Sequence, residues 1–374
     1  MARILHIFTT VDHKYRTRFI DFVGQHDLGY QSTFLYWERP ELSDSLGQGS
    51  TKPLRRFSKK LVSAKSKILF LIRLVIECHL RKNDHYFLHG LFTNNRLSPM
   101  ILVTLNLMSR DQLRTVCWRI WGGDLYGIEE KPLLKTLKKR LVQRIGCAGT
   151  LLEGDVQAAR LKYEAQNLAR ADLSYPLVVP LTQKSVQKNQ NDKMKILVGN
   201  SATPTNQHEE IFRILAGFEL KNFEIHCPLA YGDTTYRTTI EKLGHELFPK
   251  SFYSTQELIT PAKYHEFIST IDIAIFNTNR QQAVGTILLL LYLQKKVYLP
   301  SSNSPFAYFL SLGLKIHDTS EIKRQGPEAF LKIDPKEYEM NQEIVFRNHS
   351  DQATADRWRA YLCSGMPRPK LRGS

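Results

Sequence analysis

Residues 276–299 read FNTNRQQAVGTILLLLYLQKKVYL, and their pattern indicates the architecture of the domain around them. The apolar, β-branched run that ends at Phe276 predicts a buried strand. Gly285 and Thr286 are typical of a helix start, and Lys295–Lys296 ends that helix before a further strand. A strand, a polar loop, a helix and a strand in this order indicate an αβ-alternating domain built on a parallel sheet.

The polar loop between that strand and helix predicts a ligand site. In parallel sheets, ligands bind where the carboxyl end of a strand meets the next helix. The first N–H groups of the helix, at Gly285 and Thr286, suit a phosphate. Arg280 adds a full charge, and Gln281 and Gln282 can hydrogen-bond a base or a sugar. Such loops also occur in α/β proteins that bind nothing there, so the stretch alone leaves a structural role open.

Length and composition limit the class of protein. The 374 residues, of which 42% are hydrophobic, are enough for two domains with their own cores. Five scattered cysteines without Cys-x-x-Cys spacing are typical of reduced thiols in a cytosolic protein. No signal peptide is expected, because the N-terminus runs directly into a predicted strand. The apolar stretches Ile68–Leu80 and Ile287–Leu293 are shorter than the roughly 20 residues of a membrane-spanning helix.

Positive charge is concentrated in the first half of the chain. Residues 1–190 carry 30 Lys and Arg against 16 Asp and Glu, a net charge of +14 out of the +16 of the whole chain. This asymmetry indicates an anionic partner for the first half, either nucleic acid or the anionic inner leaflet of a membrane.

Two basic clusters in this half suit a membrane surface. One lies within residues 52–82 and the other within residues 135–144. A basic helix with interleaved apolar side chains can lie on an anionic bilayer, where each Lys or Arg contributes about 1 kcal/mol. The solvated face of an ordinary surface helix is the alternative. The residues expected at the membrane are Arg55, Arg56, Lys59, Lys60, Lys138, Lys139 and Arg140.

Three residues at predicted strand ends of the first half are candidates for a general base. His13 follows the first strand, His89 lies in the strand at 86–92, and Asp124 lies in a Gly-Gly turn after the strand that contains Trp118. An aspartate among aromatic residues can acquire the raised pKa that suits a base. The alternatives are a solvated loop histidine at His13 and a helix-capping or turn aspartate at Asp124.

The polar, aperiodic residues 183–194 predict a linker between two domains. We expect the first domain at residues 1–182, the second at residues 195–350, and a closing helix with a disordered tail at residues 351–374.

Two further junctions in the second domain have the same plan as the loop after Phe276. Gly199-Asn200-Ser201 and Tyr231-Gly232 each follow a predicted strand. Because the carboxyl ends of parallel strands meet at one edge of a sheet, these loops are expected to converge. The convergence predicts a nucleotide pocket in the second domain.

Four motifs, taken together, resemble one family of enzymes. They are His89-Gly90-x-Phe92, Trp118-x-Ile120-Trp121-Gly122-x-Asp124-Leu125-Tyr126, Leu197-Val198-Gly199-Asn200-Ser201 and Arg280-Gln281-Gln282-x-x-Gly285-Thr286. In this order, the chain resembles the bacterial 4-acetamido-4,6-dideoxygalactose transferases of enterobacterial common antigen assembly, also known as 4-alpha-L-fucosyltransferases. The resemblance covers roughly residues 80–300 and is weak in residues 30–75 and beyond residue 310.

The resemblance implies an α/β glycosyltransferase of the GT-B type, with two Rossmann-like domains whose parallel sheets face a central cleft. It implies a dTDP-linked 4-acetamido-4,6-dideoxygalactose donor in the second domain. It implies a polyprenyl-diphosphate-linked saccharide acceptor in the first domain, which also faces an anionic membrane. The implied location is the cytoplasmic face of the bacterial inner membrane, with the protein attached peripherally.

Site residues follow from the motifs and the resemblance together. Asp124 is our first choice of base, ahead of His89 and His13. Arg280 is expected at the departing diphosphate, and Tyr231 on the nucleotide base. The residues expected to bind the nucleotide sugar are Gly199, Asn200, Ser201, Tyr231, Gly232, Arg280, Gln281, Gln282, Gly285 and Thr286. Those expected to bind the acceptor are Gly90, Trp118, Trp121, Gly122, Gly123 and Tyr126.

The sequence contains no Asp-x-Asp motif, which could hold a divalent ion on a sugar diphosphate, so we expect a metal-independent enzyme without a cofactor. GDP-fucose is an alternative donor for the same fold, because a few bonds decide between sugar nucleotides. A nucleic-acid-binding protein is the alternative from another class. We disfavour it, and expect no nucleic-acid partner, because only Phe57 offers an aromatic ring within the basic runs.

Overall fold

The chain folds into two compact units. The first comprises Met1–Val178 and Asp351–Ser374, and the second comprises Val179–Ser350. The computed structural model describes residues 2–9, 13–37, 59–64, 66–127, 130–181, 193–218 and 221–364. Most of the expected linker and the tail after residue 364 lie outside these ranges, as do Arg55 and Arg56.

The first unit is built on a seven-stranded sheet with the order β3-β2-β1-β4-β5-β6-β7. Neighbouring strands pair in parallel throughout. The order reverses between β1 and β4, which is where parallel sheets of this kind place their ligands. The strands are β1 Arg3–Phe8, β2 Gln31–Trp37, β3 Lys59–Ala64, β4 His85–His89, β5 Val116–Arg119, β6 Cys147–Gly149 and β7 Ala169–Ala171.

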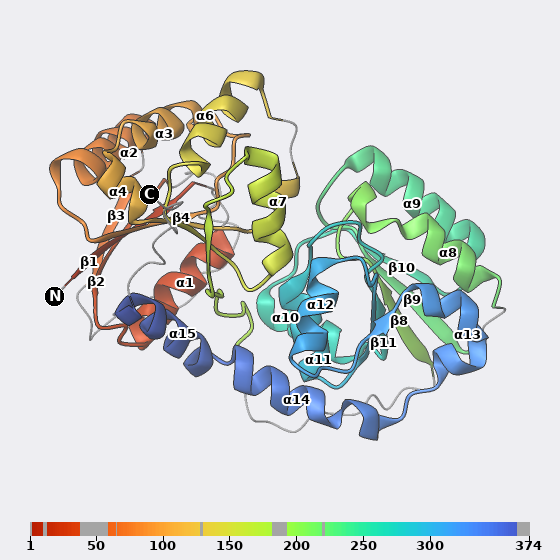
Figure 1. Ribbon diagram of the computed structural model, residues 1–374. Coiled ribbons are helices and arrows are strands. Elements are labelled where there is room, and N and C mark those ends of the chain that lie inside the picture. Colours follow the sequence, from red (N-terminus) through yellow and green to blue (C-terminus); the bar gives the residue numbers. More distant parts are fainter. Residues whose placement is uncertain are drawn as a thin grey trace. The chain divides into compact units, whose positions relative to one another are not determined.

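Helices cover both faces of this sheet (Figure 1). One core lies under α2, α3 and α6, and the other lies between the sheet, α1 and α15. The helices are α1 His13–Gln25, α2 Lys67–Val75 with the π-helical turn Ile76–Leu80, α3 Ser98–Asn106, α4 Arg110–Arg114, α5 Gly123–Tyr126, α6 Pro132–Val142, α7 Glu153–Tyr163 and α15 Asp351–Ser364.

Helix α15, the helix expected near the C-terminus, belongs to the first unit although it follows the second in sequence. Trp358 is fully buried against Phe19 and Phe87. Its Nε1 donates to the carbonyl oxygen of Ser174 at 2.9 Å. Asp351 at the start of the helix forms an ion pair with Arg18. These contacts fix the last described helix of the chain to the first sheet.

The first basic cluster differs from the helix expected there. Residues Lys59–Ala64 form the edge strand β3, which pairs in parallel with β2 from Ser32 to Trp37. The helix begins only at Lys67. Pairing with the free edge of β2 satisfies the backbone groups of the β-branched and apolar residues there, so tertiary context prevails over the local basic-helix pattern. The side chains of Lys59 and Lys60 lie outside what the structure describes.

Lys138 was expected at a membrane surface, and that prediction is wrong. Its side chain is only 1% exposed, and Nζ donates to the Asp124 carbonyl oxygen at 2.6 Å and to Glu130 Oε1 at 2.7 Å. On α6 it occupies the same face as Leu134 and Leu141, at the i, i+4 and i+7 positions that point to the core. Burial lowers its pKa, while the charge of Asp124 and the bond to Glu130 oppose that shift.

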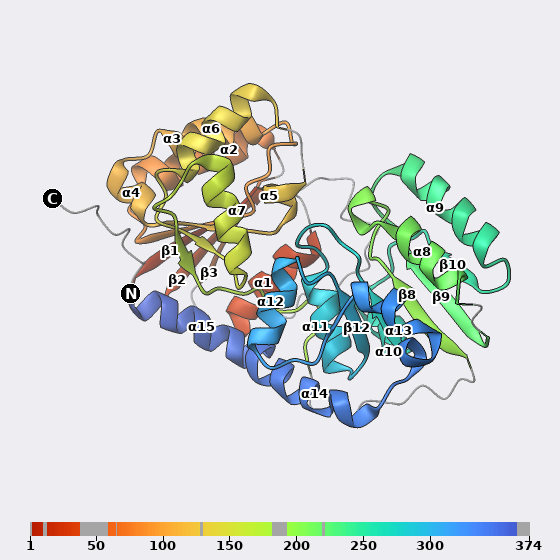
Figure 2. The ribbon, with the colours of Figure 1, turned by 45° about the vertical axis from the view of Figure 1, so that its right-hand side comes forward.

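The second unit contains a six-stranded sheet with the order β10-β9-β8-β11-β12-β13. Its strands also pair in parallel. Helices α8 and α9 lie on one face, and α10 and α11 lie on the other (Figure 2). The strands are β8 Met194–Val198, β9 Phe223–Pro228, β10 Phe252–Thr255, β11 Ile273–Ile275, β12 Lys296–Leu299 and β13 His317–Asp318. The helices are η3 Pro204–Asn206, α8 His208–Ala216, α9 Thr234–Leu247, α10 Pro261–Ser269, α11 Val284–Tyr292, α12 Ser304–Ser311, α13 Ser320–Leu331 and α14 Pro335–His349.

The strand, loop, helix and strand expected over residues 276–299 are present as β11, α11 and β12. Lys296 differs from its expected place at the helix end, because it begins β12 and is buried. Its Nζ donates to the carbonyl oxygens of Ala329, Phe330 and Lys332. A lysine in this position supplies donors to carbonyl groups that the end of α13 leaves unpaired.

Within the described ranges, no helix is long and apolar enough to cross a membrane.

Lowering the pH from 7 to 5 is expected to destabilise the first unit. Burial lowers the pKa of His6 to about 3. Burial, together with the neighbouring His6 and Arg119, also holds the pKa of His89 well below its usual value. In the unfolded chain both histidines titrate near pH 6.5, so at lower pH the unfolded state binds protons that the folded state does not. Each histidine then lowers the free energy of unfolding by about 1.4 kcal/mol per pH unit.

Urea unfolding followed by tryptophan fluorescence measures this effect, because all four tryptophans (37, 118, 121 and 358) belong to the first unit. In the variant His6→Gln, the number of protons that the chain takes up on unfolding at low pH should fall by one, so the unfolding free energy should depend less steeply on pH. A free energy that stays constant between pH 7 and pH 5 in the unmodified chain would contradict the prediction.

Candidate active site

Three loops of the second unit meet at the carboxyl edge of its sheet, where the strand order reverses between β8 and β11. We call them the switch-point loops, residues 199–207, 229–233 and 276–283. Asn200 Nδ2 donates to the Tyr231 hydroxyl at 2.8 Å, and Gln282 Nε2 donates to Asn200 Oδ1 at 2.6 Å. The chain of bonds continues from Gln282 Oε1 to the hydroxyl of Thr205, which donates at 2.8 Å. Asn200, Tyr231 and Gln282, each expected from sequence, are therefore brought together.

Two glycines of the switch-point loops occupy positions where a side chain would not fit. Gly199 has φ +70°, and an added Cβ would lie 2.3 Å from His208 Nε2. Gly232 has φ +124°, and its Cβ would lie 2.3 Å from the carbonyl oxygen of Ala202. At that point Ala202 N donates to Tyr231 O and Asp233 N donates to Ala202 O, both at 2.7 Å. A side chain at Gly232 would therefore separate the first two switch-point loops, and one at Gly199 would displace His208 of α8.

Ser201, expected to bind the nucleotide sugar, instead belongs to a hydrogen-bonded turn. It is buried, and its hydroxyl shares a bond with the Thr203 hydroxyl at 3.0 Å. Thr203 bonds Thr205 in the same way at 3.0 Å, and buried Asn206 donates to Ser201 O at 2.9 Å. Thr203, Thr205 and Asn206 were missed from the sequence. The signal for them is the high content of Asn, Ser and Thr between Gly199 and Asn206, because these side chains can hydrogen-bond nearby backbone groups in turns.

The third switch-point loop holds Arg280 beside the start of α11. Asn303 Nδ2 donates to the carbonyl oxygens of Thr278 and Arg280, both at 3.0 Å, and fixes the loop backbone. Arg280 remains partly exposed. Among the described residues, Gln281 Oε1 is buried and has no hydrogen-bond partner. A guanidinium, an unsatisfied amide oxygen and a helix N-terminus together suit the phosphate and polar groups of a nucleotide.

Thr286 and Gly285 lie in the first turn of α11. The Thr286 hydroxyl shares a hydrogen bond of 2.8 Å with the Tyr264 hydroxyl of α10. Burial raises the pKa of Tyr264 to about 12, so its hydroxyl stays protonated at neutral pH. Gly285 is exposed. The helix start is thus tied to its neighbour while its backbone remains open at Gly285.

In the first unit, Asp124 ties together the loops at the carboxyl edge of the sheet. It is 4% exposed. Its Oδ2 accepts from Leu91 N at 2.8 Å and from Trp118 Nε1 at 2.7 Å, and its Oδ1 accepts from Trp121 N at 2.9 Å. Both carboxylate oxygens therefore accept bonds that join the loop after β4 to the turn after β5. This is the turn-aspartate alternative, and it supports a positioning role in place of direct proton transfer.

His89 lies in the core and does not reach a substrate, contrary to the expectation that it could act as a base. Its side chain is fully buried. His6 Nδ1 and His89 Nε2 are 2.9 Å apart, and His89 Nδ1 bonds the Tyr175 hydroxyl. His13 begins α1, and its side chain lies outside what the structure describes.

Of the residues expected to bind the acceptor, some are buried in the core and others are partly exposed at the edge of the sheet. Trp118 is fully buried, which contradicts its expected contact with a sugar. Trp121 is partly exposed and meets the rings of Tyr15 and Phe92 edge-on. Tyr126 is partly exposed and bonds Asp155 at 2.9 Å. Tyr15 and Phe92 were not among the expected site residues, although Phe92 lies in a quoted motif.

The glycines of this edge make room for the aromatic rings. Gly90 has φ +76°, and an added Cβ would lie 2.5 Å from the Phe92 ring. An added Cβ at Gly123 would lie 3.4 Å from the same ring. Gly122 has φ +83° and precedes α5. The role of these three glycines is therefore to permit this backbone conformation and to leave room for the Phe92 ring.

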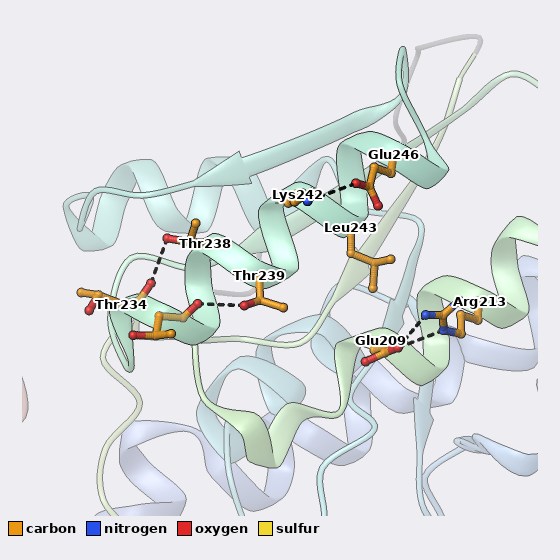
Figure 3. Close-up of a pocket in the computed structure, with 9 residues that line it drawn as sticks. Glu209, Arg213, Thr234, Thr238, Thr239, Lys242, Leu243 and Glu246 are labelled. Carbon is orange, nitrogen blue, oxygen red and sulfur yellow. Dashed lines mark hydrogen bonds and ion pairs between the residues drawn. The ribbon is translucent and has the colours of Figure 1, made fainter.

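A groove of about 720 Å³ between α8 and α9 is separate from this site (Figure 3). Most of its polar side chains bond within their own helices. The hydroxyls of Thr238 and Thr239 donate to the carbonyl oxygens of Thr234 and Thr235, Arg213 pairs with Glu209, and Lys242 pairs with Glu246. Since these groups are already partnered, the groove does not direct unsatisfied polar groups at a ligand.

Solved structures with very different sequences share this fold. A glycosyltransferase from Rickettsia africae is 11% identical, with a TM-score of 0.64 over 97% of this chain and 99% of that one. HepE of Anabaena, solved with UDP and glucose, is 9% identical, with a TM-score of 0.65 over 98% and 100%. The N-terminal domain of a trehalose-6-phosphate phosphatase from Candida albicans is 8% identical, with a TM-score of 0.68 over 97% and 96%. The fold is that of GT-B glycosyltransferases.

A family comparison agrees with the motifs found in the sequence. The family described as 4-alpha-L-fucosyltransferase, glycosyl transferase group 56, matches residues 55–311, which is more than half of the chain. The match includes the switch-point loops and the edge around Asp124. The chain therefore belongs to the 4-alpha-L-fucosyltransferase family, glycosyltransferase group 56.

Proposed function

We propose that this glycosyltransferase moves 4-acetamido-4,6-dideoxygalactose from a dTDP donor to a polyprenyl-diphosphate-linked saccharide. The observation that carries the proposal is the bonded set Asn200, Tyr231 and Gln282, which joins three loops at the sheet edge next to Arg280. The choice of donor and acceptor rests on the family resemblance of the motifs. GDP-fucose remains the alternative donor.

The second unit would hold the nucleotide sugar. Tyr231 is 47% exposed and can stack on the base. Arg280 and the N–H groups of the first turn of α11 would stabilise the diphosphate as it leaves and gains charge. Gln281 Oε1 can accept a bond from an N–H group of the base or the sugar amide. No step of this proposal requires a metal ion, in keeping with the lack of an Asp-x-Asp motif.

The first unit would hold the acceptor against Trp121, Tyr126 and the glycine-rich turn at Gly122. Because Asp124 and His89 are engaged with protein groups, we propose His13 as the base that takes the proton of the acceptor hydroxyl. Asp124 would position the loops on which the acceptor lies. We place this chemistry at the cytoplasmic face of an inner membrane, with the protein attached peripherally.

A thermal-shift panel with dTDP, UDP, GDP, ADP and single-stranded RNA tests the donor. A ligand at about 100 times its Kd stabilises the native state by about 2.7 kcal/mol, so dTDP should raise the melting temperature most. Arg280→Gln should weaken dTDP binding at least about tenfold, because a charged hydrogen bond contributes about 1.5–3 kcal/mol. Arg324→Gln is the matched control, since the Arg324 side chain is 75% exposed and distant in sequence.

The other outcomes of the panel would favour other functions. Selective stabilisation by GDP would favour the GDP-fucose alternative. Stabilisation by single-stranded RNA alone would favour the nucleic-acid-binding alternative and remove Arg280 from its assigned role. Unchanged dTDP affinity in Arg280→Gln would place the diphosphate elsewhere.

A further inference from the structure

Helices α2 and α3 are apolar on the faces they turn away from the core. On α2, Phe70 and Leu74 are buried, yet Ile68, Ile72 and Val75 are 70%, 51% and 43% exposed. A helix that is apolar all round is normally enclosed by protein or by lipid. The exposed apolar side chains define the outer apolar face, which consists of Ile68, Leu69, Ile72, Val75, Met100, Val103, Leu107 and Leu133.

These side chains belong to neighbouring helices of one layer. Helices α2, α3, α4 and α6 lie side by side over the same face of the first sheet in both views (Figure 1, Figure 2). Met100, Val103 and Leu107 follow each other at helical spacing along α3 and just past its end, while Leu133 lies at the start of the adjacent α6. Exposed apolar side chains gathered in this way mark an interaction site.

A cavity of about 610 Å³ beside this face is lined by Arg110, Arg114, Arg140 and Arg144, which we call the arginine cavity. Within the described part of the chain, no carboxylate lies within ion-pair distance of Arg110, Arg140 or Arg144, and Arg114 meets only the exposed Asp111 at 3.7 Å. Burial and the charges of Arg140 and Arg110 lower the pKa of Arg144. Arg144 also donates to the carbonyl oxygens of Asn106 and Met108. The exposed guanidinium groups of Arg110, Arg114 and Arg140 are met by one carboxylate only, which favours a ligand with several negative charges.

The helices around the arginine cavity are almost free of acidic residues. Lys and Arg number two on α2, none on α3, two on α4 and four on α6, against the single carboxylate Asp111. Two of those on α6 are already paired with carboxylates from elsewhere in the unit, the buried Lys138 with Glu130 and Lys139 with Glu164. A protein partner with a mixed surface would leave the other positive charges on these helices uncompensated. Apolar side chains beside uniformly positive ones match a lipid monolayer, in which acyl chains lie under a plane of phosphates.

We infer that the outer apolar face and the arginine cavity together dock the protein on a bilayer that contains anionic phospholipids. The apolar side chains enter the headgroup boundary, and the arginines bind headgroup phosphates, whose oxygens match the planar guanidinium fork. The inference rests on the proposed function, in which the protein attaches peripherally to the bilayer that holds the acceptor, and adds the surface that makes this contact.

The fold relates this surface to the candidate acceptor edge. Each helix after a parallel strand runs from the carboxyl edge of the sheet back to its amino edge, so α3 and α6 begin near Trp121 and end near the arginine cavity. A membrane plane laid along both helices therefore passes beside the edge that holds Trp121. The surface differs from the one expected from sequence, of which Lys139 and Arg140 are on α6 and Lys138 is buried.

Vesicle co-sedimentation tests the inference with the full chain. Vesicles of phosphatidylcholine with about one third phosphatidylglycerol should bind the protein, and vesicles of phosphatidylcholine alone should bind it at least about tenfold more weakly. Two variants test the two parts of the surface separately. The apolar variant combines Ile72→Gln, Val103→Gln and Leu107→Gln, and the charge variant combines Arg110→Glu and Arg140→Glu. Each should weaken binding at least about tenfold, and added salt should weaken binding by the unmodified chain.

Matched variants elsewhere control for the changes in polarity and charge. Leu161, Leu258 and Met340 are 75%, 69% and 67% exposed, so their replacement by glutamine is the control for the apolar variant. Lys242→Glu with Arg324→Glu is the control for the charge variant, because both side chains are highly exposed. Both controls should bind vesicles like the unmodified chain.

Several results would overturn the inference. It fails if the unmodified chain does not bind anionic vesicles, or if the two surface variants bind them as well as their controls. It also fails if the apolar variant instead abolishes a dimer seen by analytical ultracentrifugation, because a second copy of the chain then covers this face. Stabilisation by dTDP is measured in parallel, so loss of vesicle binding and failure of the proposed donor are separate outcomes.

Discussion

Replacement of Gly232 by alanine is expected to abolish dTDP binding and to destabilise the second unit by about 3 kcal/mol or more. The new Cβ would lie 2.3 Å from the carbonyl oxygen and 2.5 Å from the carbonyl carbon of Ala202, at a φ of +124°. Backbone atoms cannot rotate away as a side chain can, so the loops after β8 and β9 must separate. Tyr231 then moves away from Asn200, and the bonded set at the sheet edge is lost.

Isothermal titration with dTDP and thermal unfolding would measure both effects. Gly217→Ala is the matched control, because Gly217 ends α8 with φ −70° and its added Cβ would find no atom closer than 3.5 Å. This control should keep its dTDP affinity. If Gly232→Ala binds dTDP like the unmodified chain, the contact between the two loops does not shape the donor site.

Replacement of Asp124 by asparagine is expected to abolish transfer and to destabilise the first unit by about 3 kcal/mol or more. Three N–H groups donate to this carboxylate. An asparagine amide must turn its own N–H₂ group toward at least one of them, which leaves a buried donor unsatisfied. The affinity for dTDP should remain unchanged, because the switch-point loops belong to the second unit.

Urea unfolding followed by tryptophan fluorescence reports the stability of the first unit, and Asp111→Asn is the control because the Asp111 side chain is 94% exposed. The measurement also separates two roles of Asp124. An asparagine variant that is inactive but fully stable would restore Asp124 as the base. A variant that is stable and active would remove it from both roles.

Sequence reasoning identified the second unit well because its signals are local. The strand before Phe276, the helix start near Gly285 and the glycines at 199 and 232 follow from chain geometry within a few residues. Thr203, Thr205 and Asn206 were missed because their importance lies in bonds to one another and to Gln282. Residue type alone does not show which of several hydroxyl groups will find such partners.

The first unit was harder to predict because its sheet is covered on both faces. In a strand buried on both sides, alternation of polar and apolar residues no longer indicates exposure, so His89 could not be distinguished from a residue at an open edge. Asp124 was expected in a turn and lies in the short helix α5, and the sequence does not show that three N–H groups donate to it. Lys138 was predictable in principle, since its spacing from Leu134 and Leu141 places it on the inner face of α6.

Helix α15 has a consequence for biosynthesis of the chain. The second unit is continuous in sequence, so it can fold as soon as its residues leave the ribosome. The first unit is not, because Trp358 completes the core around Phe19 and Phe87 only after the whole second unit has been made. During translation one apolar face of the first sheet therefore stays uncovered until α15 has been made. Chaperones protect a nascent chain from aggregation while such a surface is exposed.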